Sequence, residues 1–257
     1  ILVFFFVAQY GQRFISRGTT ESNDDQQLIV LTHNTGQDLP GYQERYDTIM
    51  NSNAHIVLLQ EITEDFLLAY GDRLSKSYPY RTIGPFQQDR DQNVGMAILS
   101  TYPILDTANF RLATDGLVLQ QRAVIRIREQ DFAVYNIHTT FPWIHMRTNR
   151  IFKNLQFPEY DDTVRGREIE KLGELLSKEQ LPIIIGGDFN MGDQSQDYRT
   201  LIETGLLDTY SAVGYGFGFT WPANRTPSVD IKLAVPFIRV DYIFCSQGFV
   251  PRTAGVL

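Results

Sequence analysis

The chain has 257 residues, of which 43% are hydrophobic and 21% are charged, a composition typical of a soluble globular domain with a sizeable core. Its formal net charge of -7 argues against broad electrostatic capture of nucleic acid, although an acidic protein can act on phosphates when a bound cation supplies positive charge. The single cysteine, Cys245, excludes an intramolecular disulfide and a zinc site built from several cysteines.

The first 27 residues divide into two parts of different composition. Residues 1–14, ILVFFFVAQYGQRF, contain an apolar run that is shorter than the roughly 20 residues a membrane-spanning helix needs. They are interpreted as the end of a transmembrane or signal segment, and residues 15–27 as a polar linker that follows it. A buried first strand is the alternative for the apolar run.

From residue 28 onwards, strand-like and helix-like patterns interleave without an internal linker, which predicts one domain over residues 28–257. Apolar residues at helical spacing predict helices at 42–53, 63–74 and 163–180. Apolar runs of strand length predict strands at 27–35, 55–62, 94–100, 122–128, 132–140, 182–190 and 239–246, with a hairpin turn at 129–131. This mixture predicts an α/β fold of two packed mixed sheets covered by helices. The order strand, helix, strand, each strand with a polar end, occurs twice and indicates an internal repeat.

Side chains able to bind a metal or a phosphate follow the predicted strands. They are Asn34, Gln60, Glu61, Asn136, His138, Asp188, Asn190 and Asp241. Because residues i and i+2 of a strand share a face, Asp188 and Asn190 point together while Phe189 points into the core. Carboxylates and amides without cysteine suit a hard ion such as Mg²⁺ or Mn²⁺.

The motifs LTHNTG, LLQEI, GMAILSTYPI, YNIHTT, GGDFN and RVDYIF follow one another over about residues 28–246. In this order they resemble the motifs of the endonuclease/exonuclease/phosphatase superfamily, which includes deoxyribonuclease I-like nucleases and bacterial sphingomyelinases. The stretch GFGFTWPA at 216–223 is similar to one in membrane-anchored bacterial members. The resemblance implies a four-layer α-β-β-α sandwich with an internal pseudo-two-fold axis.

The resemblance also implies a role for each matching residue. Glu61 would be the main ligand of Mg²⁺ or Mn²⁺, with Asn34 beside it, and His138 would contact the scissile phosphate. Asp188 would orient or deprotonate the attacking water, and Asn190 would hold that water and the phosphate. Asp241 would pair with a catalytic histidine, and the expected substrate contacts are Asn136, Arg147 and Arg150.

The chain departs from the family pattern at its end. Members of the family end in a Ser-Asp-His motif, but none of the four histidines here, at 33, 55, 138 and 145, follows Asp241. We expect the catalytic domain to be truncated, with its last strand or strands missing. The alternative is a chain that has lost activity.

Several of these residues also have a purely structural interpretation. Glu61 could be an acid at the start of the helix at 63–74, although Thr63 is the better cap; Asn34 could be a turn residue and His138 a core histidine. Asp241 could pair with Arg239 or Arg122. The stretch 141–168 is irregular and rich in aromatic and basic residues, which suits either substrate contact or a self-packed surface loop. Tyr215, Phe217, Phe219 and Trp221 alternate, which indicates strand packing.

The expected function is divalent-metal-dependent hydrolysis of a phosphodiester or phosphomonoester, of a nucleic acid or a phospholipid headgroup, by in-line attack of an activated water. The alternative is an inactive module of the same fold that binds a phosphorylated ligand or protein partner. We expect a monomer anchored at its N-terminus to a bacterial membrane, with the catalytic domain outside the cytoplasm.

Overall fold

The structure is a computed structural model that describes residue 13 and residues 27–36, 41–89, 92–114, 118–148, 156–222 and 235–257. The apolar N-terminal run and the linker predicted at 15–27 lie outside these ranges, apart from residue 27, so the predicted anchor stays a prediction. Within the described ranges, no helix combines the length and the apolar character that crossing a bilayer requires.

The first half of the domain forms a mixed sheet with two helices. In the order β1-β2-β5-β3, with β4 also paired to β5, its strands are β1 (Val30–Asn34), β2 (Ile56–Thr63), β5 (Gln92–Ser100), β3 (Tyr80–Ile83) and β4 (Gln87–Asp89). The helices are α2 (Tyr42–Asn51) and α3 (Glu64–Ser77). Helix α3 begins where the Thr63 hydroxyl accepts a hydrogen bond from the Phe66 N–H at 3.2 Å, as expected for a capping threonine.

The second half forms a six-stranded mixed sheet with three helices. The strands, in sheet order, are β12 (Leu207–Asp208), β13 (Asp241–Cys245), β11 (Ile183–Asp188), β8 (Gln130–His138), β7 (Gln120–Ile127) and β6 (Ile104–Phe110). The helices are α4 (Thr163–Leu176), α5 (Gln196–Glu203) and α6 (Thr209–Val213). The predicted hairpin is the antiparallel pair β7 and β8.

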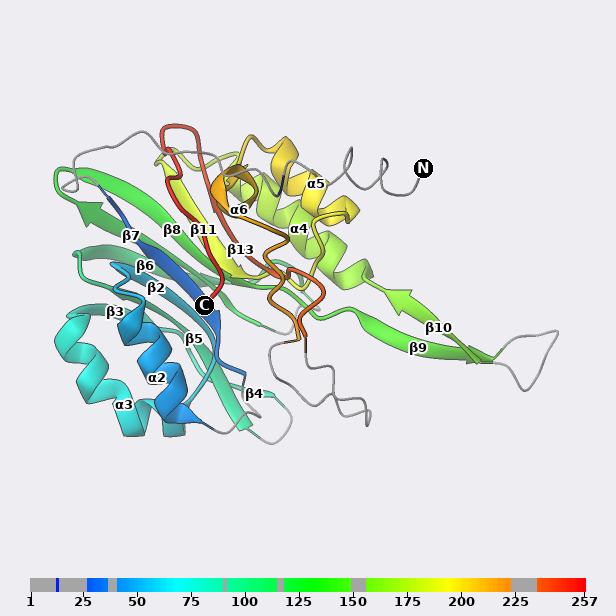
Figure 1. The fold of residues 1–257 in the computed structure, drawn as a ribbon, viewed down its shortest axis with the longest axis horizontal. Helices are drawn as coiled ribbons and strands as arrows, with labels where there is room; N and C mark the ends of the chain where they lie inside the picture. Colours follow the sequence, from blue (N-terminus) through cyan, green and yellow to red (C-terminus); the bar gives the residue numbers. More distant parts are fainter. Residues whose placement is uncertain are drawn as a thin grey trace.

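Three apolar cores separate four layers of secondary structure (Figure 1). One core joins the first sheet to α2 and α3, and another joins the second sheet to α4 and α5. The third lies between the sheets and contains Leu58, Ile98, Val134 and Ile184. The sheets approach so closely at Gly186 that a Cβ atom there would lie 2.8 Å from Leu58 Cδ1. The predicted α/β sandwich of two packed mixed sheets is confirmed.

The internal repeat predicted from the sequence is present in the topology. Strands β1 and β2 are parallel and joined through α2, and β8 and β11 are parallel and joined through α4. At the carboxyl end of each pair, Asn34 lies opposite Gln60 and His138 lies opposite Asp188. Both halves therefore bring polar side chains to the same end of the two sheets.

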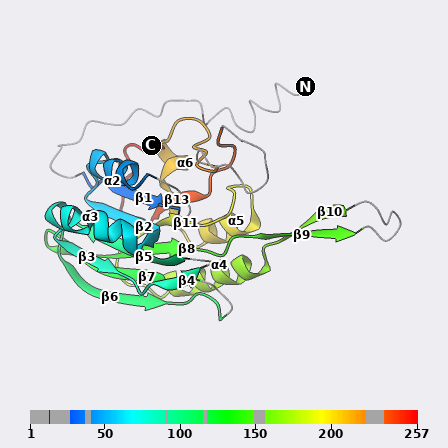
Figure 2. The same ribbon diagram turned by 90° about the horizontal axis from the view of Figure 1, so that it is seen from below.

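Two expectations about irregular and aromatic segments are corrected. The stretch after His138 is not simply a loop, because β9 (Trp143–Thr148) and β10 (Gln156–Asp161) form an antiparallel ribbon. Figures 1 and 2 both show this ribbon extending away from the body of the domain. The alternating aromatic run is not a strand: Phe217 and Phe219 stack at 4.9 Å in irregular backbone, and only Trp221 forms a single bridge, to Ile238.

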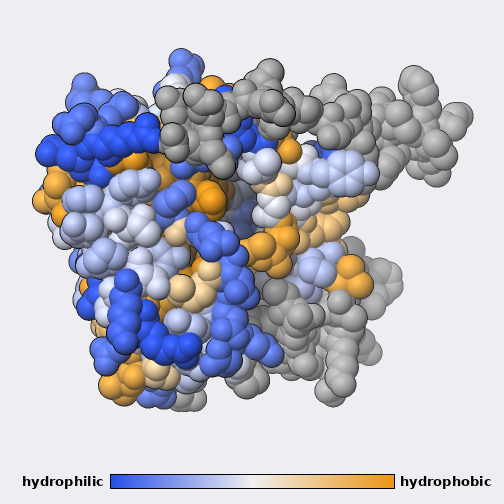
Figure 3. All heavy atoms as spheres, turned by 60° about the vertical axis from the view of Figure 1, so that its left-hand side comes forward, coloured by the Kyte–Doolittle hydropathy of each residue, from blue (hydrophilic) through white to orange (hydrophobic). Residues whose placement is uncertain are grey.

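The surface of the described residues is mixed in polarity. On the face drawn in Figure 3, hydrophilic side chains predominate, and hydrophobic residues reach the surface in small groups around a central hollow. This distribution agrees with a chain whose charged residues are mostly solvated.

A partly buried ion pair fastens the segment that follows α4 to the second sheet. Glu179 accepts hydrogen bonds from Arg122 Nε and from the Tyr135 hydroxyl, both at 2.8 Å. Burial alone would raise the pKa of Glu179, but the hydrogen bonds from Arg122 and Tyr135 outweigh it and lower that pKa to about 2.

We predict that Glu179→Gln destabilises the fold in a pH-dependent way. A carboxylate whose pKa falls on folding stabilises the protein fully above its ordinary pKa of 4.5, and this contribution is lost as the pH falls towards 2. The free energy of unfolding in urea should therefore drop by about 1–2 kcal/mol at pH 7 and by less at pH 3. The control is Glu174→Gln, which removes an exposed partner of Lys171. A deficit that is equal at both pH values would contradict the assignment.

Candidate active site

The site begins with a β-bulge that turns Glu61 out of its strand. Strand β2 pairs with β5 at Leu59 and again at Ile62, but two residues of β2 face only one of β5 in between. Glu61, in this bulge, has a φ of 52°, which is unusual for a residue with a side chain. The bulge redirects the Glu61 carboxylate towards the strand ends of the other sheet.

Asn136 holds this bulge from the opposite sheet. Its side chain is fully buried, and Nδ2 donates to the carbonyls of Leu59 at 2.9 Å and Ala97 at 3.1 Å. Its Oδ1 accepts a hydrogen bond from Gln60 Nε2 at 2.6 Å. A side chain with no exposed surface and these bonds shapes the site from within, and the expected contact of Asn136 with substrate stays a prediction.

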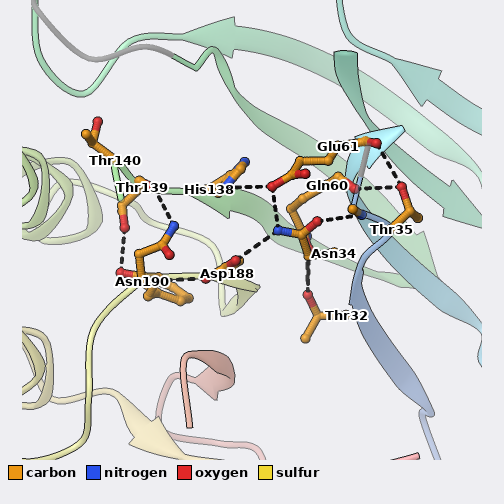
Figure 4. A network of polar contacts seen from close by, with 12 residues as sticks. Thr32, Asn34, Thr35, Gln60, Glu61, His138, Thr139, Thr140, Asp188 and Asn190 are labelled. Carbon is orange, nitrogen blue, oxygen red and sulfur yellow. Dashed lines mark hydrogen bonds and ion pairs between the residues drawn. The ribbon is translucent and has the colours of Figure 1, made fainter. Parts of the chain in front are cut away.

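Asn34 connects the two carboxylates of the site (Figure 4). Its Nδ2 lies 2.9 Å from Glu61 Oε1 and 2.9 Å from Asp188 Oδ2. Its Oδ1 accepts the Gly36 N–H at 2.9 Å, which completes a turn after β1. The turn and the bridging contact coexist, and the amide nitrogen rather than the oxygen faces the carboxylates.

Asp188 ends strand β11 in the sharp turn that the GGDFN motif makes. Its Oδ1 accepts the Asn190 N–H at 2.9 Å, and Asn190 has a φ of 47°. The preceding Gly187 has a φ of 153°, and a Cβ atom there would lie 1.7 Å from the Ile137 carbonyl oxygen. Phe189 points into the core, as predicted, with no exposed surface.

Asn190 is held on both sides. Its Nδ2 donates to the Thr139 carbonyl at 2.8 Å, and its own carbonyl accepts from the buried guanidinium of Arg165. Arg165 also pairs with Asp197 at 2.7 Å, which connects the turn to α4 and α5. The sequence gives no sign of this role for Arg165, because arginine on an amphipathic helix usually faces solvent.

His138 faces Glu61 across the gap between the sheets. Its Nε2 lies 3.7 Å from Glu61 Oε1. The fully buried Gln120 holds its backbone twice: His138 N–H donates to Gln120 Oε1 at 2.7 Å, and Gln120 Nε2 donates to the His138 carbonyl at 2.9 Å. Two residues further along the chain, Thr140 donates from its N–H and its hydroxyl to the buried Glu168.

The remaining predicted residues lie at different distances from this cluster. Asp241 lies opposite Asp188 in the β11–β13 pair, and its N–H donates to the Thr220 hydroxyl at 3.2 Å. Arg239 pairs with Asp208, and Arg122 pairs with Glu179. Arg147 is on β9, its side chain outside the described part, and Arg150 lies outside it altogether.

His33 belongs to the packing around the site. It precedes Asn34 on β1 and so points to the opposite face of the strand, and its burial, together with the charge of Arg45, lowers its pKa to about 4. It is therefore neutral at physiological pH.

The electrostatics of the cluster favour a bound cation. Burial raises the pKa of Asp188, and the charge of Glu61 raises it further, whereas His138 and the hydrogen bonds from Asn34 and Asn190 oppose this rise. Two carboxylates thus share one bridging amide nitrogen in a mostly buried setting.

No three His, Cys, Asp or Glu side chains among the described residues stand close enough together to hold a metal ion by themselves. The donor set nevertheless fits Mg²⁺ or Mn²⁺, because such ions take one or two carboxylates and complete their shell with water and substrate phosphate. Glu61 would supply the carboxylate, with the Asn34 amide beside it. In the present arrangement the Asn34 nitrogen takes the place between the carboxylates where positive charge is needed.

We predict that Asn136→Ala loosens the Glu61 bulge. It removes the donor to the Leu59 and Ala97 carbonyls, which stay buried, so the free energy of unfolding should fall by about 2–3 kcal/mol. Amide hydrogen exchange around Glu61 should accelerate as well. Asn109→Ala, at an exposed position of β6, is the matched control. Equal stability of the two variants would contradict the bulge-holding role.

Several proteins of known structure share this fold. A protein of the endonuclease/exonuclease/phosphatase family from Leptotrichia buccalis is similar in structure, with a TM-score of 0.65 at 17% identity over 90% of this chain and 92% of that one. Sphingomyelinase C from Streptomyces griseocarneus matches with a TM-score of 0.62 at 17% identity, over 87% and 85% of the two chains. A mannosyl-6-phosphatase from Bacteroides thetaiotaomicron matches with 0.57 at 19% identity, over 90% of both.

At these identities the structural matches show a shared fold, and no curated protein matches the sequence. The model of the Endonuclease/Exonuclease/phosphatase family matches residues 31–257, which include Asn34, Glu61, His138, Asp188 and Asp241. The chain therefore belongs to the endonuclease/exonuclease/phosphatase family.

Proposed function

We propose that this protein hydrolyses phosphate esters with the help of a divalent cation held at Glu61. The observation that carries the proposal is the convergence of both halves of the fold on one point: Asn34 bridges Glu61 and Asp188, and His138 faces the same Glu61 oxygen at 3.7 Å. Membership of a family of phosphoesterases supports the reaction class.

Each side chain has a role that its contacts support. The Asp188 carboxylate is oriented by hydrogen bonds from Asn34 and Asn190. It accepts a proton from a water molecule, and the oxygen of that water attacks the phosphorus atom. His138, with its backbone fixed by Gln120, donates to a non-bridging phosphate oxygen. Glu61 would hold a divalent cation, which when bound would supply positive charge for the phosphate and the departing alcohol.

The burial of Asp188 suits the role of base. A carboxylate whose pKa is raised by burial is a stronger proton acceptor than an exposed aspartate. The same environment disfavours a negatively charged phosphate unless a cation is present. The proposal therefore requires metal dependence.

We expect Asp188→Asn to lower the hydrolysis of bis-p-nitrophenyl phosphate by about 100-fold or more, because it removes the general base. The assay uses the natural full-length protein with Mg²⁺. Glu64→Gln, at the exposed start of α3 three residues from Glu61, is the control and should keep full activity. An Asp188 variant that hydrolyses the reporter at the unmodified rate would exclude the proposed base.

Removal of divalent cations with EDTA should abolish hydrolysis, and added Mg²⁺ or Mn²⁺ should restore it. In Glu61→Ala, restoration should need a higher metal concentration, because the main carboxylate ligand is gone. Hydrolysis that continues in EDTA would rule out the metal-dependent mechanism. Metal-dependent phosphate binding without hydrolysis would point to a binding module.

A further inference from the structure

Beside the proposed catalytic cluster lies a group of partly exposed aromatic side chains that the proposed chemistry does not use. We define the aromatic wall as Phe141, Trp221 and Phe237. The ring of Trp221 lies 6.5 Å from that of Phe141 and 5.6 Å from that of Phe237. Phe141 is 52% exposed and Phe237 is 51% exposed. Half of each phenyl side chain thus faces solvent at an energetic cost that a bound apolar group would remove.

The wall is attached to the catalytic cluster on both sides. Phe141 follows His138 by three residues, and the segment between them is fixed by the bonds of Thr140 to Glu168. Trp221 exchanges backbone hydrogen bonds with Ile238, and the neighbouring Thr220 hydroxyl accepts the Asp241 N–H. The wall and the phosphate-binding residues therefore form parts of one rigid edge.

The charges at this edge argue against a second phosphate as the group that the wall receives. Arg165, which binds the Asn190 carbonyl, is paired with Asp197. Arg239, two residues after Phe237, is paired with Asp208, and Arg13 is paired with Asp193. Sites that bind a single-stranded nucleic acid combine aromatic rings, on which the bases stack, with basic side chains along the phosphate backbone. Among the residues described, the wall instead combines aromatic rings with arginines whose charge is already balanced.

The arrangement of the rings favours an aliphatic or bulky apolar group over a single flat base. The planes of Trp221 and Phe237 are inclined by 76°, and those of Phe141 and Trp221 by 49°. Rings at such angles offer an uneven apolar surface rather than the parallel faces between which a base stacks.

We propose that the aromatic wall binds the apolar alcohol portion of a phosphate ester that carries a single phosphate. This inference rests on the proposed function, because it assumes that the phosphate lies at Glu61, His138 and Asp188. It assigns the substrate class as an ester of phosphate with an apolar alcohol, whether this is a free alkyl ester or the apolar part of a lipid.

The test is a binding series that needs no catalysis. The natural full-length protein with Mg²⁺ is titrated calorimetrically with n-alkylphosphonates from methyl to octyl, whose C–P bond is not hydrolysed. Affinity should rise by about two- to fourfold per methylene over the first few members of the series. In the double variant Phe141→Ser/Phe237→Ser the dependence on chain length should disappear, while methylphosphonate binds as before.

Two controls separate lost packing from lost binding. Phe141→Leu/Phe237→Leu should restore most of the dependence on chain length, and Leu105→Ala, which removes an exposed leucine from β6, should leave it unchanged. Thermal unfolding of each variant verifies that it is folded. The inference would be overturned if affinity did not depend on alkyl chain length in the unmodified protein, or if it still rose with chain length in Phe141→Ser/Phe237→Ser.

Two further arms identify the source of the apolar group and keep the inference separate from the proposed function. Tighter binding of monomeric octylphosphonate than of vesicles of neutral phospholipid indicates a free ester, and the reverse order indicates a lipid; in either case the wall variant must bind more weakly. If affinity rises with alkyl chain length but the protein hydrolyses no ester, the proposed function is refuted, whereas the assignment of the aromatic wall as an apolar binding surface stands. The inference would also be overturned if the protein bound an oligonucleotide more tightly than octylphosphonate and this preference were the same in Phe141→Ser/Phe237→Ser.

Discussion

The site depends on one buried amide, that of Asn136, which joins the two sheets where their strands end. A β-bulge leaves backbone carbonyls without their usual partners, and inside a protein such groups are costly unless another donor reaches them. Asn136 supplies that donor from the opposite sheet, to the carbonyls of Leu59 and Ala97. The bulge can therefore exist in a buried position, and only because it exists does Glu61 face Asp188 and His138.

The duplicated topology explains why the residues of the candidate site come from distant parts of the chain. In each β-α-β unit the parallel strands end at the same edge, and the two units stack so that these edges coincide. Close stacking requires residues without bulk, such as Gly186 against Leu58. The consequence is electrostatic: carboxylates from separate halves meet in a place with little water, which raises the pKa of Asp188 and makes the cluster attractive to cations.

Much of this could be predicted from the sequence, because alternation, helical spacing and the polar residues after strands are local patterns. The two β-α-β units, the cap at Thr63 and the inward direction of Phe189 followed from such patterns. The role of Asn136 could not be predicted, since the sequence places it on the same strand face as His138 but does not show that β2 bulges opposite it.

The contribution of Gln120 was equally hidden, because a glutamine next to a second glutamine at the start of a strand has no distinctive pattern. The ribbon of β9 and β10 was missed because its basic and aromatic residues do not alternate clearly. The aromatic run at 215–221 was wrongly predicted to be a strand, because its aromatic residues alternate. Gly216 and Gly218 adopt positive φ angles, which interrupt a strand.

The double hydrogen bond between Gln120 and the backbone of His138 has a consequence for how such a domain can change. The Gln120 side-chain amide makes the two hydrogen bonds with the His138 backbone that a neighbouring strand would otherwise make. The hydrogen-bonded ladder of the second sheet is therefore extended by one residue through a side chain. His138 belongs mechanically to the sheet, although the ribbon segment leaves the sheet directly after it. Because the histidine is held by the sheet, the ribbon can lengthen, shorten or change its surface residues without moving His138, so the outer contacts can diversify around an unchanged site.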